Sequence, residues 1–113
     1  MHELSLAMEV VDLASREASG NNINNILSIR IEIGDICGVD ADVFRSALEI
    51  ASHHSILEHA EIEIIRTPGK AICRECTGEV LVTELLSVCP RCGIIPEIIT
   101  GGKEFRVLSM LAE

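Results

Sequence analysis

The chain has 113 residues and a formal net charge of −9, from 18 acidic and 9 basic residues. Aliphatic side chains are abundant, whereas the only aromatic residues are Phe44 and Phe105. This length suits one ordinary domain, or a small core with a smaller attached module. The negative charge and the lack of aromatic platforms argue against binding to nucleic acid or to anionic lipid.

The first twenty residues predict a helix and no targeting segment. Apolar side chains recur there at helical spacing, at Leu4, Ala7, Met8, Val11, Ala14 and Ala18. Charged side chains lie mostly on the opposite side, which predicts an amphipathic helix over residues 4–18, ended by "SGNN" at 19–22. The same charges argue against a signal peptide or a membrane span. We therefore expect a cytoplasmic protein, whose thiols stay reduced.

A strand and a second helix follow. Leu27, Ile29, Ile31 and Ile33 alternate with polar side chains, which predicts a strand with one buried face. Asp40 is a plausible N-cap for a second amphipathic helix that ends near His53 and His54.

Two further strands are predicted, one before and one after the cysteine-rich segment. "AEIEII" at 60–65 alternates isoleucine with glutamate, and "TPGK" at 67–70 interrupts that pattern. A last strand, from Phe105 to about Met110, is expected to return to the first sheet.

Four cysteines give the strongest signal in the sequence. Cys73 and Cys76, and then Cys89 and Cys92, each form a pair separated by two residues. Two such knuckles supply four thiolates for a tetrahedral ion, so a closed structural zinc site is the first interpretation. Iron in a rubredoxin-like site and redox-active thiols are the alternatives. The remaining cysteine, Cys37, is expected to be a small buried residue without chemistry.

The predicted fold class is therefore α+β, with two helices on a three-stranded sheet and an inserted zinc-ribbon-like module. Residues 1–68 and 101–113 would form the α/β domain, and residues 69–100 the zinc-binding domain. A module of this size has too little apolar area to order itself, so the metal would stabilise its fold.

The amino terminus offers a second candidate metal site. The large side chain at position 2 should block removal of Met1, which leaves a free α-amine beside the amide and imidazole of His2. These nitrogens can surround Ni(II) or Cu(II) in one plane, and Glu3 can fill a remaining position. From three residues alone, an ordinary translation start is the more common explanation.

Three further histidines, His53, His54 and His59, surround the predicted end of the second helix. The first two are expected at a helix C-terminus, where the helix dipole favours imidazolium. An auxiliary weak metal site there is a less common alternative.

Over nearly its whole length the chain resembles the HypA/HybF family of hydrogenase maturation factors. The resemblance is carried by "MHELSL", "IEIGDICGVD", "ILEHAEIEI", the paired cysteines with "CPRC", and "GGKEFRV", in that family's order and spacing. Departures are His59, where the family usually has glycine, and the unusual "HHSIL" before it.

The resemblance implies a nickel metallochaperone, not an enzyme, that delivers Ni(II) for maturation of [NiFe]-hydrogenase. It implies nickel binding by Met1, His2 and Glu3, and structural zinc bound by the four paired cysteines. The implied partners are a nickel-binding GTPase of the HypB kind and the hydrogenase large subunit, with a urease accessory protein resembling UreE in some members.

Three rival functions make different predictions. A zinc-ribbon adaptor for nucleic acid would bind it in a salt-sensitive way, against the charge of −9. A thiol redox protein would oxidise reversibly and lose metal. A zinc-containing docking protein would leave nickel to another carrier, and the sequence does not distinguish it from a metallochaperone.

Overall fold

A computed structural model describes residues 2–83 and 87–113, so the predicted ligand Met1 lies outside the described residues. Within them the elements are α1 (His2–Gly20), β1 (Ile26–Gly34), α2 (Ala41–Ala51), β2 (Glu61–Thr67), β3 (Gly69–Ile72), β4 (Glu79–Val82), β5 (Ile98–Gly101) and β6 (Phe105–Ala112). The strands form two three-stranded sheets, ordered β2-β1-β6 and β4-β3-β5. The predicted α+β fold class is confirmed.

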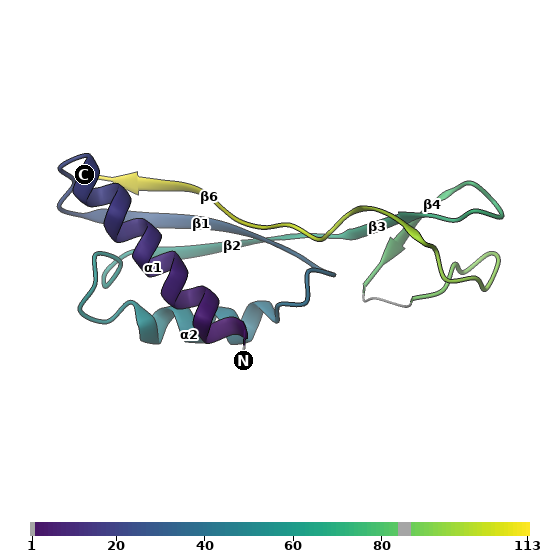
Figure 1. Ribbon diagram of the computed structural model, residues 1–113, viewed down its shortest axis with the longest axis horizontal. Coiled ribbons are helices and arrows are strands. Elements are labelled where there is room, and N and C mark those ends of the chain that lie inside the picture. Colours follow the sequence, from purple (N-terminus) through teal and green to yellow (C-terminus); the bar gives the residue numbers. More distant parts are fainter. Residues whose placement is uncertain (1, 84–86) are drawn as a thin grey trace. The chain divides into compact units, whose positions relative to one another are not determined.

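Helix α1 covers the predicted span and extends it by two residues at each end. Its buried face consists of Ala7, Val10, Ala14 and Ala18, and α1 packs against α2 (Figure 1). At the end of the helix the backbone N–H groups of Asn21 and Ile23 both donate to the Ala18 carbonyl, at 3.3 and 2.9 Å. Among the described residues, no helix is long and apolar enough to cross a membrane.

Strand β1 has the predicted alternation only in its second half. Ile29, Ile31 and Ile33 are at most 1% exposed, as expected for one buried face. The prediction that Leu27 belongs to that face was wrong, because Leu27 is 43% exposed and Ile26 is buried instead.

Helix α2 begins as predicted at an Asp40 cap. One carboxylate oxygen of Asp40 accepts hydrogen bonds from the N–H groups of Asp42 and Val43, at 3.0 and 3.1 Å. These two donors have no acceptor within the helix, so the cap satisfies them. The buried face of α2 centres on Phe44 and Leu48, both fully buried.

The second sheet is built around β3, which pairs antiparallel with β4 and with β5. The chain reaches this sheet through a close backbone approach at Gly102, where an added Cβ would collide with the backbone of Gly69. Gly102 also has φ +94°, a conformation that favours glycine. Its carbonyl accepts a hydrogen bond from the Ile36 N–H at 2.9 Å.

The chain divides into two compact units. The first comprises Met1–Ile31, Val39–Ile65 and Arg106–Glu113, and the second comprises Glu32–Gly38 and Arg66–Phe105. In the second unit Ile36 packs with Ala71 and Val82 in a small apolar cluster. The division 1–68 with 101–113 and 69–100 stays a prediction, and the compact units differ from it in grouping residues 32–38 with the cysteine-rich segment.

Candidate metal centres

The structure brings the four paired cysteines together. The sulfur atoms of Cys73, Cys76, Cys89 and Cys92 all lie within 4.8 Å of one another. The Cys76 and Cys89 sulfurs are 4.0 Å apart, close to the about 3.8 Å that tetrahedral Zn–S bonds of about 2.3 Å would give. Cys37 is not part of this group, and the prediction that it is buried was wrong, because its side chain is half-buried.

Backbone hydrogen bonds shape the two knuckles. The Cys73 N–H donates to the Gly78 carbonyl at 3.1 Å, and the Cys89 N–H donates to the Ile94 carbonyl at 2.7 Å. Cys73 and Cys89 are fully buried and pack with Val80 in an apolar cluster. Two of the four cysteines are therefore also part of the core of the second unit.

The electrostatics of the cluster favour a bound cation. The Gly78 backbone and the Arg91 guanidinium lower the pKa of the Cys76 thiol to about 6. Desolvation of the sulfur, followed by the neighbouring Cys73 and Cys76 side chains, raises the pKa of Cys92 to about 12. Four thiols this close cannot all ionise alone, whereas a divalent ion compensates their charge, so the donor set fits zinc.

Arg91 is a contributor to this centre that the sequence reasoning missed. Its Nε donates to the Cys76 sulfur at 3.3 Å, and a terminal guanidinium nitrogen lies 3.5 Å from the Glu79 carbonyl oxygen. Its position between Cys89 and Cys92 was the available signal, because a cation inside a knuckle faces the thiolates.

Of the three predicted nickel ligands, the structure describes the side chain of Glu3 alone. The Glu3 carboxylate accepts a hydrogen bond from the backbone N–H of Asp40 at 3.1 Å. This contact joins the first turn of α1 to the N-cap of α2. Helix α1 begins at His2, so the backbone nitrogen of that residue lies in a first turn, where helices have no internal acceptors.

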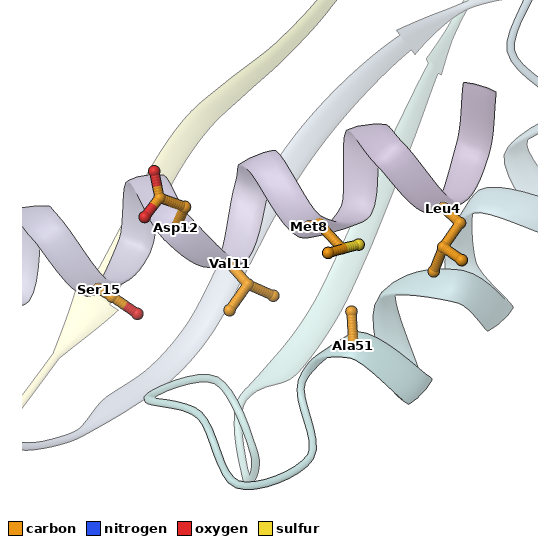
Figure 2. Close-up of a pocket in the computed structure, with 6 residues that line it drawn as sticks. All are labelled: Leu4, Met8, Val11, Asp12, Ser15 and Ala51. Carbon is orange, nitrogen blue, oxygen red and sulfur yellow. The ribbon is translucent and has the colours of Figure 1, made fainter. Parts of the chain in front are cut away.

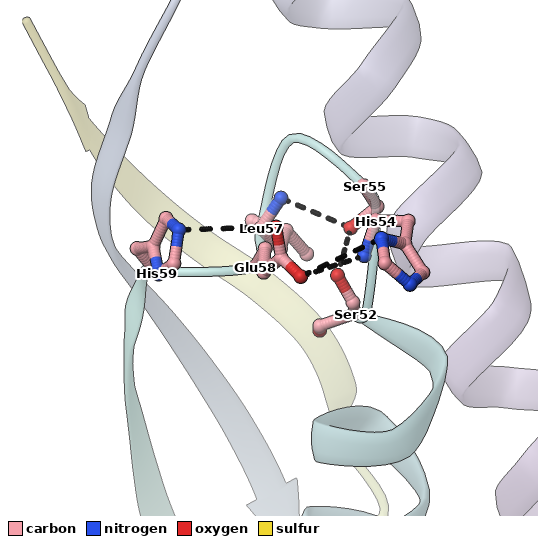
Figure 3. Close-up of polar contacts among 6 residues, drawn as sticks. All are labelled: Ser52, His54, Ser55, Leu57, Glu58 and His59. Atoms are coloured by element: carbon pink, nitrogen blue, oxygen red, sulfur yellow. Dashed lines mark hydrogen bonds and ion pairs between the residues drawn. The ribbon is translucent and has the colours of Figure 1, made fainter.

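The three other histidines follow the second helix instead of lying in its last turn. Helix α2 ends at Ala51 and its C-cap is Ser52, so His53 and His54 directly follow the helix C-terminus, close to its predicted end, and lie in a turn. The side chains of His54 and His59 each lie 3.8 Å from an oxygen of Glu58 (Figure 3).

A groove also lies beside the amino-terminal half of α1. It has a volume of about 430 Å³ and is lined by Leu4, Met8, Val11, Asp12, Ser15 and Ala51 (Figure 2). Most of these side chains are apolar, and Asp12 is paired with Arg16 at 3.1 Å. This lining is typical of a packing surface.

Comparisons with known proteins agree with this architecture. The family model for HypA, described as a metallochaperone for hydrogenase and urease nickel incorporation, matches residues 1–112. The hydrogenase maturation factor HypA of Francisella philomiragia is 36% identical, over 98% of both chains. That of Azotobacter chroococcum mcd 1 is 31% identical over the full length of both.

Two solved structures have the same fold. The solution structure of the nickel metallochaperone HypA from Helicobacter pylori aligns with a TM-score of 0.65 and 27% identity, over 97% of this chain and 96% of that one. A second HypA solution structure gives a TM-score of 0.68 and 28% identity, over 100% and 97%. With its cysteine cluster and full-length match, this chain belongs to the HypA family of nickel metallochaperones, which are carriers and not enzymes.

Proposed function

We propose that the chain carries Ni(II) at its amino terminus, on Met1, His2 and Glu3, and holds structural Zn(II) on its four paired cysteines. The observation that carries the carrier function is the family match, which begins at residue 1 and covers residues 1–112. The zinc assignment is supported by the four sulfurs lying within 4.8 Å of one another.

The two proposed sites suit different tasks. Four cysteine ligands leave zinc no open coordination position, so that ion stabilises the fold and takes no part in exchange. A chain end, by contrast, presents an amine, an amide nitrogen and an imidazole that a partner's ligands can replace one at a time. Nitrogen-rich planar coordination favours Ni(II) or Cu(II) over zinc.

Local structure supports metal binding at the end of α1. Because His2 is the first residue of the helix, coordination by its backbone nitrogen breaks no hydrogen bond within α1. The hydrogen bond from Asp40 to the Glu3 carboxylate fixes this turn beside α2. Of the proposed ligands, Glu3 is therefore held in the first turn of α1.

Nickel binding on the untagged chain and on His2→Ala tests the proposal, with both chains loaded with zinc. Native mass spectrometry should count one zinc in both chains and one tightly bound nickel in the unmodified chain only. A chain with extra residues before Met1 should lose tight nickel binding although His2 is intact, because its amine is no longer terminal.

The same ligand set predicts pH dependence. Imidazole ordinarily titrates near ~6.5 and the α-amine near ~7.7–8.0, so protons compete with nickel as the pH falls through this range. Nickel affinity should therefore decrease from neutral to mildly acidic pH. Retention of the tightly bound nickel by His2→Ala would show that the amino terminus is not its site. Absence of tight nickel binding from the unmodified chain would instead favour a zinc-containing docking protein.

We infer further that nickel passes between this chain, a GTPase of the HypB kind and the large subunit of [NiFe]-hydrogenase. Urease is a second proposed client, reached through a urease accessory protein. The family description names both hydrogenase and urease. Restoration of hydrogenase and urease activities by this chain in cells lacking their own carrier would identify the client.

A further inference from the structure

The loop after α2 is held in one conformation by its own serines and a buried leucine. The Ser52 hydroxyl donates to the Leu48 carbonyl at 2.6 Å, and the Ser55 hydroxyl donates to the Ser52 carbonyl at 2.7 Å. The Ser55 hydroxyl in turn accepts from the Leu57 N–H at 3.1 Å, and Leu57 is 1% exposed. The residues that follow Leu57 are therefore fixed to the core of the first unit.

Glu58 lies between two imidazoles in this loop. Its Oε2 is 3.8 Å from the His54 Nδ1, and its Oε1 is 3.8 Å from the His59 Nε2 (Figure 3). Its Oε2 also accepts a hydrogen bond from the His54 backbone N–H at 3.1 Å. His54 has φ +62°, an uncommon conformation for a residue other than glycine, and this hydrogen bond stabilises it.

The surroundings are favourable to a cation. The His54 backbone N–H, and then the neighbouring imidazoles, hold the pKa of the Glu58 carboxyl below its usual range, so this group is ionised at neutral pH. Residues 46–65 contain no lysine or arginine. Glu58 and His59 also line a cavity of about 280 Å³, together with Asn24 and Asn25.

We propose that Glu58, His54 and His59 form a second Ni(II) site, in addition to the amino terminus and separate from the cysteine cluster. Both carboxylate oxygens of Glu58 would chelate the ion, with one imidazole on each flank. Two nitrogens and two oxygens around one ion are a ligand set that suits Ni(II) or Cu(II).

The site is not preassembled in the metal-free chain, because among the described residues the four paired cysteines are the one group whose ligand atoms already lie together. Ligand bonds of about 2.0–2.2 Å place neighbouring ligand atoms about 3 Å apart, less than the 3.8 Å seen on each side of Glu58. The His54 and His59 side chains are 94% and 89% exposed, so both rings can turn toward the carboxylate without disturbing the core. Such an open site would hold nickel in exchange with solution and not as a permanent cofactor.

The test uses the zinc-loaded full chain in which His2→Ala and one added residue before Met1 remove the terminal site. Nickel titration by calorimetry, with ions counted by native mass spectrometry, should show one Ni(II) beyond the zinc. Because this background lacks the terminal ligands, the result is independent of the proposed function. Failure of the terminal site and failure of the loop site are thus distinguishable.

Three variants test the ligands. Glu58→Gln should abolish this nickel, because an amide offers one oxygen and no charge. His54→Asn and His59→Asn should each weaken it by about tenfold or more, since loss of even an outer-shell partner costs about 10–100-fold. Asparagine tolerates the left-handed conformation at position 54, and position 59 is exposed, so both variants should fold.

His53→Asn is the matched control, because His53 is the same residue type in the same loop but outside the Glu58 ion pairs of Figure 3. It should leave nickel binding within about twofold. The proposal is overturned if the background chain binds no nickel beyond adventitious millimolar affinity. Equal binding by His59→Asn and the background chain, or equal losses in His53→Asn and His59→Asn, would also contradict it.

Discussion

The two compact units of this chain are stabilised by different means. The first unit buries aliphatic side chains of α1, α2 and β1 around Phe44 and Leu48, both fully buried. The second unit buries two small clusters, one of Ile36, Ala71 and Val82 and one that contains two of the four paired cysteines. The first unit therefore has a conventional apolar core, whereas two of the proposed metal ligands are part of the small core of the second unit.

The two proposed metals differ in the same way, in how far their ligands belong to a buried core. Two of the four proposed zinc ligands in the second unit are also core residues, because Cys73 and Cys89 are fully buried. The proposed nickel ligands belong to the amino terminus and, for the second proposed nickel site, to the exposed loop after α2. Loss of zinc should therefore change structure, whereas loss of nickel should leave the fold intact.

Removal of zinc is the largest expected effect. Structural zinc contributes about 10–16 kcal/mol of apparent binding free energy, and the small clusters of the second unit cannot replace it. Cys73→Ser should abolish zinc binding. In an NMR spectrum, the amide resonances of β3, β4 and β5 should then lose their dispersion, because these strands unfold. The resonances of α1 and α2 should persist, because their core contains none of the ligands.

Cys37→Ser is the matched control, because Cys37 is half-buried and outside the cysteine cluster. It should keep its zinc and the dispersed spectrum. Loss of order in α1 and α2 on zinc removal would break the comparison, since the first unit would then depend on the metal of the second.

A core substitution in α2 comes next in size. Phe44→Ala removes the largest fully buried side chain and should lower the free energy of unfolding of the first unit by about 3–5 kcal/mol. Denaturant unfolding followed by helical circular dichroism measures this change. The neighbouring Val43 is 51% exposed, so Val43→Ala should cost less than about 1 kcal/mol. Phe44→Ala should still bind one zinc.

The sequence predicted the elements whose periodicity reflects one buried face. The spacing of Ala7, Ala14 and Ala18 located α1, and the alternation of Ile29 and Ile31 located β1, because burial on one side imposes these repeats. Leu27 was misplaced because both Ile26 and Leu27 are apolar, and the pattern does not say which of two adjacent residues is buried.

Interactions between distant segments could not be predicted in the same way. Ile36 lies with Ala71 and Val82, and no local pattern relates a loop residue to strands more than thirty residues away. The four cysteines were predictable because their spacing encodes the ligand geometry. Arg91 and Glu58 were missed, since their roles depend on where a flexible side chain lies after folding, although Glu58 stands at the helical spacing i+4 from His54.

The smallest expected effect is that of a substitution beside the cysteine cluster, at Arg91. Arg91 donates to the Cys76 sulfur and favours its thiolate form, so Arg91→Gln should speed zinc loss without preventing binding. This hydrogen bond is exposed, so solvent screening keeps its effect small. We expect a rise of up to about tenfold in the rate of zinc transfer to a colorimetric chelator. Arg74→Gln, which removes an exposed pair with Glu97 at 2.9 Å, should leave that rate unchanged. Equal rates for the two variants would mean that total charge, and not the contact with Cys76, retains the metal.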